Sequence, residues 1–508
     1  MTAEHSQPPP QARLLRYLPL PTLAIGSSLL LALQLAAGTT PAFACLVFVF
    51  IWFTGLSFNE LGGFQTVSGI AVSALALKTV IFAQFVKVAL WQPADSNLIA
   101  PIETAEVMVV GMAGILVAAY FARPFVFHRD IFRPVLEPRV LLALCIVATA
   151  IGVVTQVAVR ATGENSSLGR VLNGIVLYLP AFMPMGTIAG TAYVLTRSRG
   201  AKSFGLPVAI PLFLQLAFGA LMASKLVMYE PFLAYFLTCL AFGYRYRLRH
   251  VPIALAIAAF CVVVLYPLSQ IGRNIFKAQS LTENIDGFVE FVSTNMNSLQ
   301  EIEELTATVA ELEAADTSQG LYFGTPLGLV DRFSLISPAD RLVAETLHSG
   351  HAGLDIMTKS IEILPRSITG APEAFSIGNF LGKQTGLVGD TDDTTAIAFG
   401  PFAYAFHSFD LFGTFSTIFA IFFLFFVIQK FVGNSIAASI WAIILAVYVQ
   451  HFFSEAPVTG LLFYIVRTMP FIWLLSLVIM PLCFALSRYL PNRKFSSYLF
   501  ARNSQNIS

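Results

Sequence analysis

Residues 399–429 read FGPFAYAFHSFDLFGTFSTIFAIFFLFFVIQ, an apolar run in which His407 and Asp410 are the only charged or histidine side chains. Such a run is long enough to cross roughly 30 Å of bilayer hydrocarbon as a helix rising about 1.5 Å per residue. Backbone amides in lipid must hydrogen-bond within their own segment. The run therefore predicts a transmembrane α-helix.

Comparable apolar blocks recur along the whole chain. The 508 residues are 56% hydrophobic and 12% charged, and the charged fraction is about half that of a soluble globular protein. The fold expected is all-α: a polytopic membrane bundle of about twelve helices. The predicted spans are 18–37, 41–58, 64–90, 105–122, 140–158, 170–195, 205–223, 229–244, 251–268, 399–429, 435–452 and 461–487.

The connecting segments alternate in charge. Those on one side carry 17 of the 30 basic residues, whereas the opposite short loops 91–104 and 453–460 carry none. The positive-inside rule then places both termini in the cytoplasm. The expected divisions are a cytoplasmic tail 1–17, a nine-span bundle 18–268, an extracytoplasmic loop 269–398, three spans within 399–487 and a tail 488–508.

The loop 269–398 holds 18 acidic and 7 basic residues and has no stretch apolar enough to cross. Its helix formers predict a mainly helical domain. Ser337 and Pro338 indicate a helix start with a serine cap, and Gly350 a helix end. All five cysteines lie in apolar blocks, so we expect no disulfide framework.

Nucleotide-binding, HExxH and GxSxG motifs are absent from the sequence. Basic residues on the expected outer side are few. The candidate site residues among them are Lys225, Arg273, Arg332, Arg341 and Arg366. Guanidinium groups there predict a site for an anion such as a lipid-linked pyrophosphate. Pairing with neighbouring acidic residues is the alternative, particularly for Arg332 and Arg341.

Ionisable residues inside or near the apolar blocks form a second group of candidates. Lys78 lies mid-span, where a lysine must face the bundle interior or a wet cavity, whereas Lys87 is expected to extend to the membrane surface. His407 and Asp410 are candidate bases, with an interfacial role lacking chemistry as the alternative. We expect no metal site, because the acidic loop 390–393 is typical of a turn.

Three stretches resemble bacterial O-antigen and exopolysaccharide repeat-unit polymerases of the Wzy type. One is Ser224-Lys225, followed by an apolar span and the basic turn 244–249. The second runs from Pro267 to Arg273, and the third contains Leu364-Pro365-Arg366 before Phe399-Gly400. The order of nine spans, one large loop and a few terminal spans is similar as well.

The resemblance implies a glycosyltransferase of the bacterial cytoplasmic (inner) membrane, which joins undecaprenyl-pyrophosphate-linked repeat units on the outer face of that membrane. Arg273 and Arg366 would stabilise the leaving pyrophosphate, with Lys225 near them. No cofactor is implied. The expected partners are the lipid-linked oligosaccharide, membrane lipid and the pathway's flippase and chain-length regulator, with no nucleic acid. An O-antigen ligase, a flippase or transporter, and a non-catalytic assembly component remain alternatives.

Overall fold

The computed structural model of the chain describes residues 15–127, 137–161, 182–221, 225–244, 252, 260, 322–324, 329–354, 376–392 and 395–490. Within these residues the structure is helical, and the only β-pairing is an isolated bridge between Thr66 and Ser435. The elements are α1 (Leu20–Ala36), α2 (Pro41–Leu61), η1 (Gly63–Gln65), α3 (Val67–Ala76), η2 (Leu77–Ile81), α4 (Phe82–Ala89), α5 (Pro101–Phe121), α6 (Pro138–Ala161), α8 (Phe182–Ser198), α9 (Leu206–Leu221), α10 (Lys225–Ala241), α15 (Leu329–Arg332), α16 (Ile336–Ser349), α19 (Ile377–Gln384), α20 (Gly400–Ser408), α21 (Leu411–Val432), α22 (Ile440–Ser454), α23 (Val458–Phe463), η6 (Tyr464–Thr468) and α24 (Met469–Ser487).

Six helices among the described residues are long and apolar enough to cross a membrane. They are Pro41–Leu61, Val67–Ala89, Pro101–Phe121, Pro138–Val157, Leu411–Val432 and Gly460–Ser487. Shorter apolar helices are Leu20–Ala36, Leu206–Leu221, Val227–Ala241 and Ile440–Ser454. The chain is thus a helical membrane protein, as the apolar blocks predict. The total of twelve spans stays a prediction, since span 251–268 and the start of span 170–195 lie largely outside the described residues.

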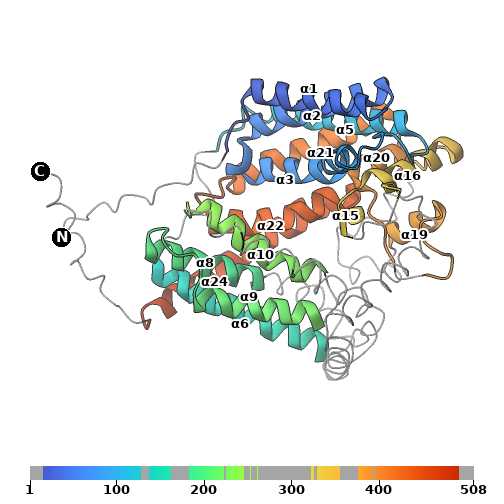
Figure 1. Ribbon diagram of the computed structural model, residues 1–508. Helices are drawn as coiled ribbons and strands as arrows, with labels where there is room; N and C mark the ends of the chain where they lie inside the picture. The colour runs from blue at the N-terminus through green and yellow to red at the C-terminus, as the bar shows by residue number, and fades with distance from the viewer. Residues whose placement is uncertain are drawn as a thin grey trace, which may run out of the picture.

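The bundle has two distinct ends, which we name by the loops that meet there. At the basic end, Leu18 N donates to Asn59 Oδ1 (2.6 Å), Val67 N to Asn434 O (2.9 Å), and Lys430 Nζ to Ala122 O (2.7 Å). At the loop end, Ala94 N donates to Thr39 Oγ1 (2.8 Å) and Gln92 Nε2 to Phe323 O (3.0 Å). The loop end carries the described parts of segment 269–398, including α15, α16 and α19 at the right of Figure 1.

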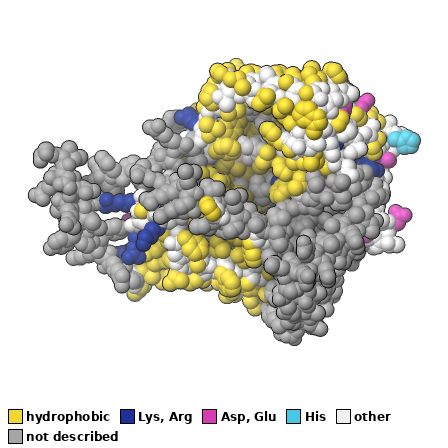
Figure 2. Space-filling model, viewed as in Figure 1, with side chains coloured by type: hydrophobic (Ala, Val, Ile, Leu, Met, Phe, Trp, Pro, Cys, Tyr) yellow, Lys and Arg dark blue, Asp and Glu magenta, His cyan; other side chains and the backbone are white. Residues whose placement is uncertain are grey.

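Charge follows the same division. On the face shown in Figure 2, most lysine and arginine side chains gather at the left, and most acidic and histidine side chains at the right. At the basic end, Arg123 pairs with Glu60. The partition agrees with the alternation of charged loops in the sequence.

Two glycines of α5 set the packing of the helices that carry His407 and Asp410. A Cβ atom added at Gly111 would lie 2.3 Å from Phe402 Cδ1 of α20, and one at Gly114 would lie 3.0 Å from Phe415 O of α21. Small residues of this kind let membrane helices approach closely.

The predicted single span 399–429 is divided in the structure. Helix α20 ends at Ser408, and α21 begins at Leu411 after an extended residue at Phe409. Asp410 caps the new helix, since its Oδ1 accepts from Gly413 N at 2.6 Å. The local capping bond thus starts a separate helix within the apolar run.

The predicted helix start at Ser337 is wrong in detail. Helix α16 begins at Ile336, its N-cap is Leu335, and no side chain caps it. Ser337 and Pro338 lie within its first turn, where proline costs no hydrogen bond. The predicted end is confirmed, because Gly350 takes a φ of 88° at the C-cap.

Candidate functional site

Lys78 lies in a π-helical turn in the middle of the span Val67–Ala89. The turn η2 covers Leu77–Ile81, between α3 and α4. Such turns insert an extra residue into a helix and occur frequently at functional sites. The Lys78 ammonium pairs with the Glu455 carboxylate and donates to Gln450 Oε1 at 3.3 Å. The predicted interior role of Lys78 therefore has a specific partner, a carboxylate at the end of α22.

His451 completes an ionic cluster with Lys78 and Glu455. Its Nδ1 lies 2.9 Å from Glu455 Oε2, one helical turn further along the chain. Burial alone would raise the pKa of Glu455, but the His451 hydrogen bond and the Lys78 charge outweigh burial and lower this pKa to about 2. Glu455 is therefore ionised at neutral pH and orients the His451 ring through Nδ1.

The described part of the outer segment reaches this cluster. Leu335 N donates to Lys78 O at 2.9 Å, and the Phe333 ring meets the Phe82 ring edge-on at 5.9 Å. Lys78 is mid-span, so the chain before α16 descends from the loop end to the level of the π turn. A carbonyl within the π turn thus accepts a hydrogen bond from the outer segment.

Asp340 fastens α16 to the start of α5. Its carboxylate accepts from Ile99 N (2.6 Å), Ala100 N (2.9 Å) and Thr104 Oγ1 (3.0 Å). Burial raises the pKa of Asp340, against the lowering by these bonds. A carboxylate at a helix N-terminus also interacts favourably with the helix dipole. Asp340 is thus held by backbone groups, and its role in the structure is to join the outer segment to the bundle.

Lys87 does not extend to the surface, so that expectation is wrong. Its side chain is fully buried. The ammonium donates to Ser96 Oγ (2.7 Å) and Ser96 O (3.2 Å) and lies 4.3 Å from the centre of the Tyr322 ring. Among the described residues no carboxylate pairs with it. A loop carbonyl and an aromatic face of the outer segment thus replace water around this cation.

His407 and Asp410, the two candidate bases, differ in burial and in their hydrogen bonds. The His407 side chain is 2% exposed; Nδ1 lies 2.8 Å from Thr346 Oγ1, and Nε2 has no partner within the described structure. Helix α20 is too short to span a membrane, and burial lowers the pKa of His407 to about 4. Asp410 is exposed and caps α21. Neither residue contacts the ionic cluster.

The remaining predicted site residues are only partly described. Arg273 and Arg366 lie outside the described residues. Lys225 opens α10 and Arg332 closes α15, but their side chains also lie outside the description. Arg341 is half-buried next to Asp340. Their convergence on one site therefore stays a prediction.

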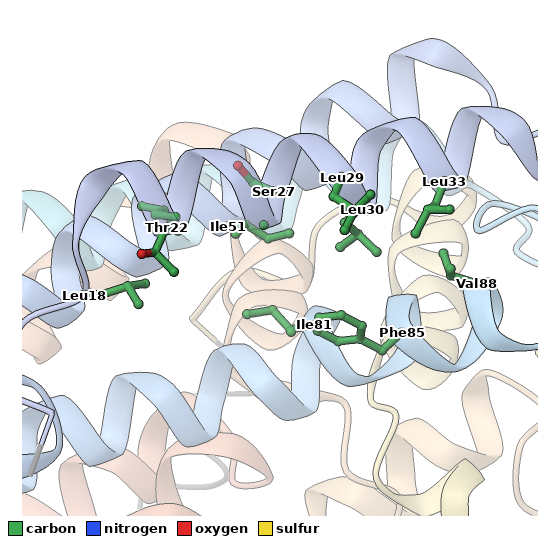
Figure 3. Close-up of a pocket in the computed structure, with 12 residues that line it drawn as sticks. Leu18, Thr22, Ser27, Leu29, Leu30, Leu33, Ile51, Ile81, Phe85 and Val88 are labelled. Carbon is green, nitrogen blue, oxygen red and sulfur yellow. The ribbon is translucent and has the colours of Figure 1, made fainter.

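An apolar groove lies beside the same π turn. It has a volume of about 320 Å³ and runs between α1 and the α4 part of the span. In Figure 3, Leu18, Thr22 and Leu33 follow one wall, and Ile81, Phe85 and Val88 the other. Ile81 is the last residue of the turn that carries Lys78.

Sequence reasoning missed Glu455, His451 and Gln450. A signal was present: Glu455 is the only charged residue in the loop 453–460, and His451 precedes it by four residues at the end of an apolar block. That spacing places the two side chains on one helix face.

Comparisons with protein-family profiles, curated proteins and solved structures give no match to this chain.

Proposed function

We propose that the chain is an integral membrane glycosyltransferase that joins repeat units carried on undecaprenyl pyrophosphate, and that it works at the loop end. The observation that carries the proposal is the ionic cluster of His451, Glu455 and Lys78, with the outer segment docked on the same turn. The outer segment descends from the loop end to the cluster, so a substrate that enters from this end meets both the bundle and the loop segment there.

His451 is the base in this proposal. A carboxylate that holds one ring nitrogen leaves the other free to accept a proton, which is the usual arrangement of an oriented histidine base. The His451 side chain is 36% exposed, against 2% for His407. A sugar hydroxyl can reach His451, whereas His407 is buried where its helix α20 packs against α16.

The acceptor hydroxyl oxygen attacks the anomeric carbon of the donor, and its proton passes to His451 Nε2. The bond from the anomeric carbon to the pyrophosphate oxygen breaks, and undecaprenyl pyrophosphate leaves with the electron pair. Glu455 stabilises the imidazolium that forms, and Lys78 keeps Glu455 ionised.

The leaving group needs cations and a place for its tail. Arg273 and Arg366, with Lys225, Arg332 and Arg341 around them, are proposed to bind the pyrophosphate, because guanidinium matches phosphate oxygens with two hydrogen bonds. The groove between α1 and α4 offers an apolar surface for part of the isoprenoid chain.

The test is the glycan ladder of a strain whose copy of this gene encodes the His451→Asn variant. Removing a general base should cut polymerisation by about 10²- to 10⁴-fold, leaving single-repeat products while the protein still accumulates in the membrane. His348→Asn is the matched control, since His348 is exposed on α16 away from the cluster. Normal chain length in His451→Asn would contradict the assignment of the base.

A transporter of lipid-linked oligosaccharide is the second candidate. The specific observation in its favour is the run of ionisable groups Lys78, Glu455 and His451 within the bundle, since such runs also serve as proton relays in transporters. A strain that lacks this gene distinguishes these functions by where its glycans accumulate. Substrate retained on the inner face indicates a flippase, and a lipid-bound polymer that is never attached indicates a ligase.

A further inference from the structure

Helices α9, α10 and α22 bring a second acidic residue into the bundle, away from the ionic cluster. Glu230 of α10 is 8% exposed, and its Oε2 lies 3.3 Å from Gln215 Nε2 of α9. Gln215 lies six residues before the end of α9, and Glu230 five residues after the start of α10. Both lie about 8–9 Å from the α9–α10 turn at a rise of 1.5 Å per residue.

The described side chains around Glu230 supply no counter-charge, and the side chain of Lys225, at the start of the same helix, lies outside the description. Helices α8, α9 and α22 pack against α10. Helix α9 has no titratable side chain; α8 carries Tyr193 and Arg197, which bond each other near its far end. Helix α22 contributes Tyr448, which interacts electrostatically with Glu230, and His451, which is bonded to Glu455. Among the described residues, Glu230 therefore has no cationic partner.

The hydrogen-bond donors and acceptors of Gln215 and Glu230 also favour a protonated Glu230. Gln215 is 1% exposed, and its Oε1 is a buried acceptor without a partner. A carboxylate can only accept hydrogen bonds, whereas a protonated carboxyl has one O–H to donate. A protonated Glu230 could donate its O–H to Gln215 Oε1 while its other oxygen accepts from Gln215 Nε2, so the protonated form removes both the unpaired charge and the orphaned acceptor.

We propose that Glu230 and Gln215 form a proton-binding site within the membrane bundle, in which Glu230 holds one exchangeable proton and Gln215 is the partner of the protonated form. The ligand is a proton, because a buried charge without compensation is far more costly than a neutral, bonded carboxyl. This proton-binding site does not depend on whether the chain transfers sugars.

Helix α22 offers a route for exchange. Tyr448, His451 and Glu455 are spaced three and four residues apart, which places them along one face of the helix. Tyr448 lies within electrostatic range of Glu230, and the ionic cluster lies at the loop end of the helix.

Infrared spectroscopy of the purified full-length protein tests the site, since the C=O stretch of a protonated carboxyl is resolved from carboxylate bands. At neutral pH we expect one such band that Glu230→Gln removes and that shifts in frequency in Gln215→Leu. If Gln215 only packed α9 against α10 and did not bond the protonated Glu230, Gln215→Leu would leave the frequency of this band unchanged. Glu455→Gln is the matched control and should remove only carboxylate absorption, because Glu455 is ionised.

The protonated-carboxyl band should diminish at high pH in the wild type. Elution of Glu230→Gln as the same species as the wild type confirms that it folds, and glutamine is the same shape as the protonated acid. Loss of carboxylate absorption in Glu230→Gln, with no change in the protonated band, would overturn the proposal. So would loss of that band on adding Na⁺ at constant pH, which would assign the site to a metal cation.

Discussion

Lys78 and Lys87 lie nine residues apart in one span, yet the structure places them in opposite circumstances. Lys78 is 13% exposed and pairs with Glu455, which in turn bonds His451. Lys87 is fully buried and bonds the Ser96 carbonyl and hydroxyl beneath the Tyr322 ring. One lysine belongs to a chain of ionisable groups, and the other holds a loop and the outer segment against the span.

The difference shows how a charge inside a membrane bundle can be assigned a role. A cation satisfied by a backbone carbonyl, a hydroxyl and a ring has no group to exchange protons with, so its removal changes stability. A cation that fixes the charge of a carboxylate, which itself orients a partly exposed histidine, influences a group that substrate can reach. We therefore assign Lys87 to structure and Lys78 to the proposed chemistry.

The largest effect is expected from Lys78→Met. Removing one partner of a buried ion pair leaves the other charge uncompensated, at a cost of about 3–5 kcal/mol for full burial. Glu455 is 32% exposed, so we expect a loss of roughly 2–3 kcal/mol, seen as a lower unfolding temperature in detergent. Activity should fall as well, because Glu455 loses the charge that keeps it ionised.

The double variant Lys78→Met/Glu455→Gln sharpens this expectation. It removes both charges, so most of the lost stability should return, whereas activity should not, since His451 then lacks its ionised partner. Recovery of activity together with stability would place Lys78 with Lys87 as a structural residue.

A smaller effect is expected from Lys87→Met. The Ser96 carbonyl and hydroxyl lose their donor, which costs about 1–3 kcal/mol for buried polar groups. Hydrogen exchange should increase at residues 322–324, while activity per folded molecule stays unchanged. Lys202→Met, at an exposed lysine of the basic end, is the control. Inactive but fully folded Lys87→Met protein would break the distinction between the two lysines.

Much of the fold can be predicted from the sequence, because the length of an apolar run fixes whether a helix can cross a bilayer. Five of the six candidate spans match predicted ones to within four residues, whereas the sixth, Leu411–Val432, begins twelve residues after the start of the predicted span 399–429. The break at Phe409 could not be predicted from hydropathy, because it depends on the Asp410 cap and on the close approach at Gly111. The π turns at 77–81 and 464–468 also leave no mark in composition.

The site was less predictable, since it depends on contacts between distant parts of the chain. Lys78 could be singled out because a mid-span lysine is costly, but its partner lies more than 370 residues further on. Lys87 was misjudged because position near a span end suggests a surface location, whereas Tyr322 of the outer segment covers it. No local pattern reveals that cover.

The smallest effect is expected at Asp410. Its variants apply the distinction between a structural residue and a chemical one to an acidic side chain. As the N-cap of α21, Asp410 accepts from Gly413 N at 2.6 Å. Alanine at an N-cap costs about 1 kcal/mol, whereas asparagine caps about as well as aspartate. Asp410→Ala should therefore lower the unfolding temperature slightly and Asp410→Asn hardly at all, with polymer length normal in both. A general base behaves differently, because asparagine accepts no proton and would stop the reaction as completely as alanine. Short glycans from a stable Asp410→Asn protein would indicate that Asp410, and not His451, is the general base.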